Sequence, residues 1–197
     1  MSAATRTPYS VVRPVAERIV EALAPCCERL ELAGSLRRMR PMIGDIEIVA
    51  IPRRPVNLFG QTLDNGPTGL DRFLDERGVR FAKRGRKYQQ FIYGRYKVDL
   101  FLTTAETWGC VFAIRTGSAD FSHWLVSPQP RGACPWSVRF GGKDAHPGRL
   151  LHDGRLLATP EEEDVFAALG LAWVEPEERH GPIMEPRRVE PVRNGYE

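Results

Sequence analysis

Two carboxylates in the first quarter of the chain stand two residues apart. Asp45 and Glu47 follow Gly44 and open an apolar run that ends at Pro52. Because residues two apart in a strand point to the same face, both side chains would be directed at one place. Two like charges that close together need a cation between them. The spacing therefore predicts metal-assisted phosphoryl or nucleotidyl transfer.

A turn of small residues lies upstream of these acids. Gly34 and Ser35 would leave backbone N–H groups free to receive anionic oxygens, and a basic stretch runs from Arg37 to Arg40. A phosphate grip followed by paired carboxylates indicates a nucleoside triphosphate as substrate.

A third carboxylate, Asp99, lies in the apolar run from Val98 to Leu102. A carboxylate in a buried strand is costly unless it is paired or bound to a cation. A strand-end Asp that hydrogen-bonds to a turn is the alternative interpretation. Together with the other two acids, Asp99 is predicted to complete the metal site.

The elements that must position these residues follow from apolar periodicity, caps and turn residues. Thr104 is expected to cap a further helix, and residues 131–149 are the least interpretable stretch, expected to form a loop or hairpin. The expected helices span 13–30, 70–77, 119–126 and 159–170, the strands 31–35, 45–52, 89–93 and 97–102, and a hairpin 150–157.

These motifs resemble the palm of family X DNA polymerases, within the nucleotidyltransferase superfamily. The resemblance lies in residues 32–38, 44–49 and 98–100. Further along, residues 115–118 resemble the Thr-Gly-Ser turn that this family places beside the incoming nucleotide. Residues 160–179 are similar to the closing segment of the family's thumb.

The resemblance covers most of the chain and implies an α+β fold. A nucleotidyltransferase palm with a mixed or antiparallel sheet and flanking helices would occupy residues 1–105. A small α/β thumb-like lobe that binds nucleotide would occupy 106–180, and a flexible tail 181–197. Without further modules to grip DNA, such a chain is expected to bind it weakly and with steep salt dependence.

The resemblance also implies site roles and cofactors. Three catalytic carboxylates would hold two Mg²⁺ ions, which Mn²⁺ can replace, and the triphosphate, sugar and base of the nucleotide would be bound nearby. Glu47, Arg115 and Ser122 stand where the family usually has an Asp, an aromatic residue and an Asn. The implied catalytic and metal-binding residues are Asp45, Glu47 and Asp99, and the nucleotide-binding residues are Gly34, Ser35, Arg38, Gly44, Arg115, Thr116, Gly117, Ser118 and Ser122.

Positive charge is concentrated just before Asp99. Residues 77–97 contain Lys and Arg but no acid, although the net charge of the whole chain is only +3. Phosphate contacts by such side chains supply most sequence-independent affinity for nucleic acid, whereas a solvated basic face is the alternative. The predicted DNA contacts are Arg84, Arg86, Lys87, Arg95 and Lys97.

The composition, 42% hydrophobic and 27% charged over 197 residues, is that of an ordinary globular protein. The sequence contains no apolar run long enough to span a membrane and no secretory signal at its start. The four cysteines lack metal-ligand spacing, so we expect reduced thiols in a cytoplasmic, monomeric protein.

We therefore expect a template-directed DNA polymerase that adds deoxynucleotides to a primer 3′-hydroxyl during gap filling or repair. Its partners would be a nucleoside triphosphate and gapped primer–template DNA. One alternative is a nucleotidyltransferase that acts on RNA, protein or a small molecule, which template dependence would distinguish. Another is a non-catalytic nucleic-acid-binding descendant, which turnover would exclude.

Overall fold

The computed structural model describes residues 6–59, 61–63, 66–141 and 148–183. These residues form two compact units, and the boundary between them lies between Thr103 and Thr104. The sequence prediction places this boundary two residues later, between 105 and 106. Most of the expected tail at 181–197, from 184 onward, lies outside the described residues, as do residues 142–147 of the expected loop. In the described part of the chain, no helix combines the length and apolarity that crossing a bilayer requires.

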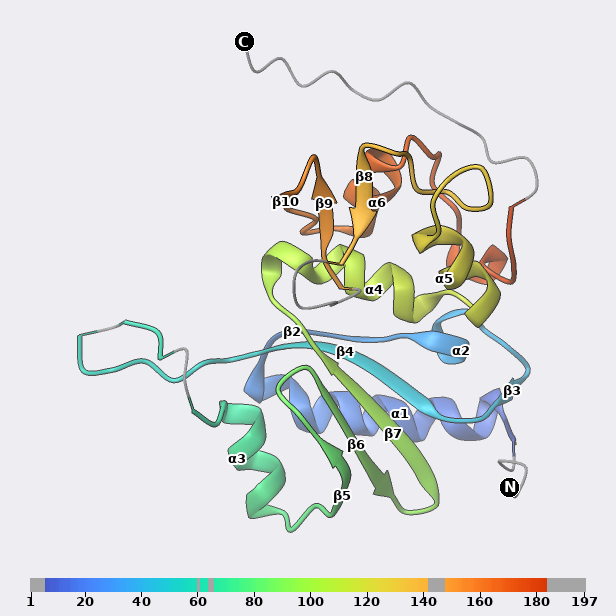
Figure 1. The fold of residues 1–197 in the computed structure, drawn as a ribbon. Coiled ribbons are helices and arrows are strands. Elements are labelled where there is room, and N and C mark those ends of the chain that lie inside the picture. Colours follow the sequence, from blue (N-terminus) through green and yellow to red (C-terminus); the bar gives the residue numbers. More distant parts are fainter. Residues whose placement is uncertain (1–5, 60, 64–65, 142–147, 184–197) are drawn as a thin grey trace. The chain divides into compact units, whose positions relative to one another are not determined.

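The first unit is built on a mixed sheet with strand order β2-β4-β7-β6-β5 (Figure 1). The two central strands, β4 and β7, run parallel to each other, and the other neighbouring pairs are antiparallel. The strands span Cys27–Leu32 (β2), Ile46–Pro52 (β4), Phe81–Arg84 (β5), Tyr88–Tyr93 (β6) and Tyr96–Leu102 (β7).

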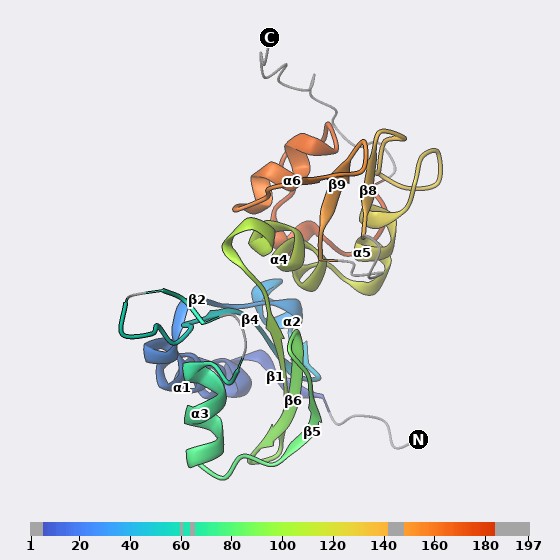
Figure 2. The same cartoon turned by 60° about the vertical axis from the view of Figure 1, so that its left-hand side comes forward.

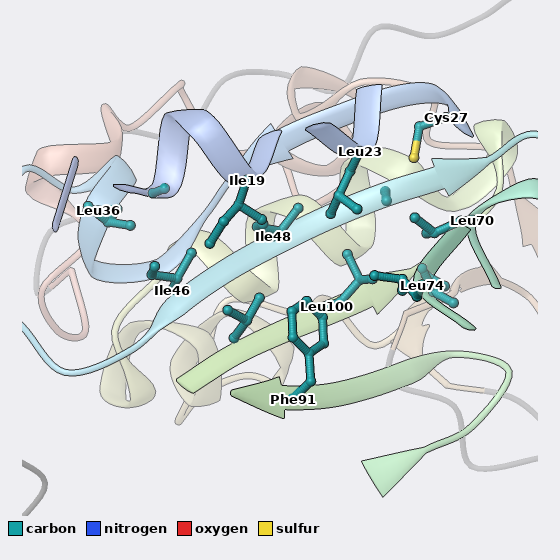
Figure 3. Packing of buried hydrophobic residues seen from close by; sticks show 14 of the residues in the cluster. Ile19, Leu23, Cys27, Leu36, Ile46, Ile48, Leu70, Leu74, Phe91 and Leu100 are labelled. Atoms are coloured by element: carbon teal, nitrogen blue, oxygen red, sulfur yellow. The ribbon is translucent and has the colours of Figure 1, made fainter. Parts of the chain in front are cut away.

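The core of this unit lies on one face of the sheet, beneath helices α1 (Tyr9–Leu23) and α3 (Gly69–Glu76) (Figure 3). Ile46 and Ile48 of β4 and Leu100 of β7 point into this core, as the period-2 pattern predicts. The alternate residues of both strands, which include Glu47 and Asp99, therefore lie on the opposite face. A short helix α2 (Gly34–Arg37) and a small pairing of β1 (Thr7–Pro8) with β3 (Met42–Ile43) complete the unit.

Three boundaries near the start of the chain differ from the sequence prediction, the first of which is the start of α1 at Tyr9 in place of residue 13. The expected helix at 13–30 is wrong in its second half, because α1 ends at Leu23 and β2 begins at Cys27. Pro25 lies in the 3₁₀ turn Ala24–Cys26 between them and disfavours a continued α-helix, because it lacks an N–H and its ring crowds the preceding turn. The expected strand at 31–35 likewise ends at Leu32, because Gly34 adopts a φ of +58° and starts α2.

The second unit packs helices against a three-stranded antiparallel sheet in the order β10-β9-β8 (Figure 2). The hairpin expected at 150–157 is present, and its turn residues Asp153 and Gly154 have φ of +47° and +81°, as a tight primed turn requires. The elements span Ala105–Thr107 (η2), Trp108–Thr116 (α4), Ala119–Val126 (α5), Val138–Phe140 (β8), Leu150–His152 (β9), Arg155–Leu157 (β10), Glu162–Ala168 (α6) and Pro176–Glu178 (η3).

Helix α6 starts later than the Thr159 cap predicts. Its N-cap is Glu161, whose side chain and that of Asp164 form a reciprocal capping box. Thr159 is fully buried instead, and its backbone bonds to Glu106 and Gly109. The expected cap at Thr104 also makes no side-chain cap bond, because the chain first forms the 3₁₀ turn η2 and α4 begins at Trp108.

A buried ion pair fixes the end of the second unit. The Arg179 side chain is fully buried, its Nη1 lies 2.6 Å from Oε1 of Glu162, and its Nε donates to the carbonyl of Val174. Its guanidinium lies over the rings of Phe166 and Trp173, with its carbon 5.0 and 4.8 Å from the ring centres. The pair thus ties the segment after α6 back to the first turn of that helix.

The four cysteines are free thiols, and three of them are buried. Burial raises the pKa of Cys27 to about 12 and that of Cys134 to about 11, so both stay protonated at neutral pH. The expectation of partly buried thiols is therefore met in the fold.

Glu162→Ala should destabilise the second unit by about 3–5 kcal/mol, because it removes the carboxylate partner of a buried guanidinium. All four tryptophans lie in this unit, so urea unfolding followed by Trp fluorescence reports on it directly. The double variant Glu162→Met/Arg179→Met should recover much of the loss, since no buried charge is left. A single variant as stable as the wild type would contradict this account of the pair.

Candidate active site

The register of the two parallel strands brings the predicted carboxylates together. Glu47 of β4 lies directly opposite Asp99 of β7, and Asp45 immediately precedes β4. All three lie on the face opposite the hydrophobic core. The sequence predicts that Asp45 and Glu47 share a face, and the sheet adds Asp99 from the adjoining strand.

A lysine bridges two of these acids. The Nζ of Lys97 lies 2.8 Å from Oδ2 of Asp45 and 2.9 Å from Oδ2 of Asp99. The hydrogen bond to Asp45, opposed by partial burial and assisted by the bond to Asp99, raises the pKa of the ammonium. Lys97 therefore remains charged and serves as a cation shared by the two carboxylates.

Asp99 has the most enclosed carboxylate of the site, with a side chain only 8% exposed. Its Oδ1 accepts hydrogen bonds of 2.7 Å from the Tyr88 hydroxyl and from Nε2 of Gln90. Burial acts to raise the pKa of Asp99, but the bonds from Tyr88, Gln90 and Lys97 outweigh it and lower the pKa. The carboxylate is thus held ionised and in a fixed orientation.

Glu47 leans away from this pair toward the upstream turn. A Cβ atom placed on Gly34 would lie 1.7 Å from its Oε2, so only glycine leaves room for the carboxylate. The guanidinium of Arg38 is partly buried here. Burial lowers its pKa, while the negative charges of Glu47 and Asp45 act in the opposite direction. The site therefore holds three acids balanced by two nearby cations.

The three acids form two groups: Asp45 and Asp99 share the Lys97 ammonium, whereas the Glu47 carboxylate lies against Gly34. Across the residues that the structure describes, no three His, Cys, Asp or Glu side chains are gathered closely enough to hold a metal ion together. Asp45 and Asp99 nevertheless converge on one cationic nitrogen, and Glu47 is Asp99's register partner on the same face. Oxygen ligands that already share one cation fit Mg²⁺ or Mn²⁺ in their donor chemistry.

The predicted phosphate-binding residues lie beside these acids. Gly34 and Ser35 open α2, whose preceding residue Ala33 donates its N–H to the carbonyl of Glu47. Arg38 follows as the C-cap of this helix. Gly44 is exposed, and a Cβ there would meet nothing within 4 Å. The turn and the acids are thus joined through β4 within one unit.

The remaining predicted nucleotide contacts belong to the second unit and make internal bonds there. Ser118 caps α5 by accepting from the N–H of Phe121, and its hydroxyl donates to the carbonyl of His180. The Ser122 hydroxyl donates to the carbonyl of Ile114 at 2.6 Å. Thr116 is fully buried, Arg115 is half-buried, and a Cβ on Gly117 would lie 2.5 Å from the Phe121 ring. These residues shape the junction between α4 and α5.

The predicted DNA contacts are not equally placed. Arg86 and Lys87 are exposed in the turn between β5 and β6, and Arg95 is exposed in the turn between β6 and β7. Arg84 makes a bidentate pair with Asp75, at 2.7 and 2.8 Å, and Lys97 is bound to the two acids. The basic run is therefore partly a network of ion pairs.

Two residues that hold Asp99 were missed by the sequence reasoning. Gln90 lies in the expected strand at 89–93 and Tyr88 directly before it, and the sequence assigns neither a contact with the acids, yet both donate to this carboxylate. A signal was present, because the tight turn at Gly94 fixes an antiparallel register in which Gln90 faces Asp99.

Comparison with known families supports a relationship in the second unit. Residues 138–180 match the family model described as the DNA polymerase beta thumb. This segment contains both Glu162 and Arg179 of the buried ion pair. No curated protein sequence matches the chain significantly. The match supports a relationship between this segment of the second unit and the polymerase beta thumb.

Gly34→Ala should destabilise the first unit by about 1–2 kcal/mol from its left-handed backbone alone, and by more because the added methyl meets Glu47. Gly44→Ala is the matched control, because a methyl group there meets open space and should change stability by less than about 0.5 kcal/mol. Urea denaturation followed by far-UV circular dichroism measures both. Equal stabilities for the two variants would contradict the close approach of Glu47 to Gly34.

Proposed function

We propose that the chain is a template-directed DNA polymerase of the family X type, which extends a primer 3′-hydroxyl by nucleotidyl transfer. One observation carries the proposal: Asp45, which immediately precedes β4, and Asp99, on the neighbouring parallel strand β7, converge on a single cation, the Lys97 ammonium. The match of the second unit to the polymerase beta thumb favours DNA synthesis over other nucleotidyl transfer reactions at these acids.

The three carboxylates would hold Mg²⁺ or Mn²⁺, which supplies charge stabilisation for the attacking and leaving oxygens of an in-line displacement. Asp99 is suited to orient the primer hydroxyl, because Tyr88 and Gln90 fix its carboxylate and keep it ionised. Asp45, which is more exposed, would face the nucleotide. The chain thus presents one rigid acid and one accessible acid.

Triphosphate binding would fall to the turn beside the acids. Gly34 and Arg38 lie next to Glu47, Ser35 follows Gly34 in the same short helix, and the Arg38 guanidinium adds a positive charge at this end of the site. Arg86, Lys87 and Arg95 are exposed cations able to bind the phosphates of DNA. A nucleotide-binding turn beside the acids, together with exposed cations for DNA phosphates, suits an enzyme that fills short gaps in DNA.

Primer extension on a one-nucleotide-gapped template, with each dNTP and rNTP supplied separately in Mg²⁺ or Mn²⁺, tests the proposal. The wild type should add the templated deoxynucleotide. Asp45→Ala and Asp99→Ala should each lower the rate by several orders of magnitude, because each removes a carboxylate from the charge-stabilising site.

Glu76→Ala is the matched control, since this exposed acid of α3 belongs to the helix layer on the other face of the sheet and should leave the rate unchanged. Near-normal turnover by Asp99→Ala would overturn the proposal. Nucleotide binding without addition to any nucleic acid would instead point to a protein or small-molecule acceptor. DNA binding without turnover in either metal would indicate a non-catalytic protein.

A further inference from the structure

Lys97 has a position that its predicted role as a DNA contact does not explain. Lys97 and Asp99 are two residues apart on β7, so their side chains share the face that carries the acids. The ammonium lies between Asp45 and Asp99, at 2.8 and 2.9 Å from their oxygens. These are two of the three carboxylates that the proposed reaction needs for its metal.

The charges around this lysine make a compensated group. Asp99 also receives donors from Tyr88 and Gln90, whereas Lys97 is the residue that brings a full positive charge to both acids. Arg38 acts on the other side, where its charge is felt by Glu47 and by Asp45. The protein's own cations therefore compensate the charge of the acids.

The lysine is also placed so that it can leave. Its side chain is 42% exposed and that of Asp45 is 31% exposed, so the ammonium can move into solvent by rotation of its own flexible stem. Partly exposed ion pairs contribute only about 0–1 kcal/mol, so a divalent ion of higher charge density can replace one. Asp99, by contrast, is held by two neutral donors that stay when Lys97 departs.

We propose that Lys97 is a built-in counter-ion that occupies the cation position between Asp45 and Asp99 and must be displaced before a divalent metal binds there. The inference rests on the proposed function, because it assigns these two acids to the metal. A metal ion can bind only to molecules in which the Lys97 ammonium has left the acids. The apparent metal affinity is therefore the intrinsic affinity multiplied by the fraction of such molecules. It also preorganises the acids, so that metal exchange does not require the sheet to rearrange.

Titration of Mn²⁺ into the full chain, without nucleotide or DNA, tests the inference through the loss of the free Mn²⁺ paramagnetic resonance signal. Lys97→Met keeps the apolar stem but removes the competing charge, and should bind Mn²⁺ about tenfold more tightly than the wild type at equal ionic strength. Lys97→Arg, which retains the charge, should not gain affinity. Arg95→Met is the matched control, because it removes one positive charge from the same hairpin, where Arg95 contacts Tyr96 rather than the acids.

A thermal melt in EDTA provides a second readout. Lys97→Met should melt at a lower temperature than the wild type because its acids repel each other, and Mn²⁺ should raise its melting temperature more than that of the wild type. A residue with only a structural role would lower the melting temperature without tightening metal binding.

Equal Mn²⁺ affinities for the wild type and Lys97→Met, with binding abolished by Asp99→Asn, would overturn the counter-ion role and leave the proposed metal site intact. Tighter binding by Arg95→Met to the same extent would also overturn it, because the effect would then be general electrostatics. An absence of Mn²⁺ binding by both proteins would overturn the metal site itself, and the inference with it.

Discussion

A buried carboxylate must be compensated by donors or by a cation, and the centre of the first unit is organised around this requirement. Asp99 lies on a central strand, almost closed to solvent, because β4 and β7 run parallel and in register. The hairpin with β6 supplies two neutral donors to one of its oxygens. Lys97, on the same strand, supplies the charge to the other oxygen and shares it with Asp45.

The two faces of the sheet have different roles: one packs the hydrophobic core, and the other carries the acids. Its core face is continuous apolar surface under α1 and α3, which fixes the strand register (Figure 3). Fixing the register of the core face also fixes the positions of the acids on the opposite face. Hydrophobic packing on one side thereby sets the geometry of charged groups on the other, within about one residue spacing.

Much of this arrangement could be predicted from local sequence patterns. Alternation in residues 46–52 and 96–102 identifies the strands and the face of each acid, and Asp153-Gly154 identifies a hairpin turn. The early end of α1 at Leu23 had a local signal in Pro25, which the apolar periodicity of residues 13–30 obscured. The late start of α6 at Glu162 was harder to predict, because Thr159 and Glu161 are competing cap candidates.

The charge partners were the harder part of the site to predict. In the sequence, Lys97 is the last of the basic residues between 77 and 97, with nothing to distinguish it from the others. The parallel pairing of β4 with β7 places it between Asp45 and Asp99. Parallel register depends on a long crossover and leaves no local signal in the sequence. The ion pair between Arg179 and Glu162 could not be predicted from local patterns either, because 17 residues separate the two partners.

Anomalous X-ray scattering from a crystal soaked in Mn²⁺ would test the central claim, that Asp45 and Asp99 form a cation site, most directly. The account predicts a Mn²⁺ peak within coordination distance of both carboxylates, with the Lys97 ammonium displaced from them. A saturating soak in which Lys97 still bridges the two acids, with Mn²⁺ bound only elsewhere, would contradict it.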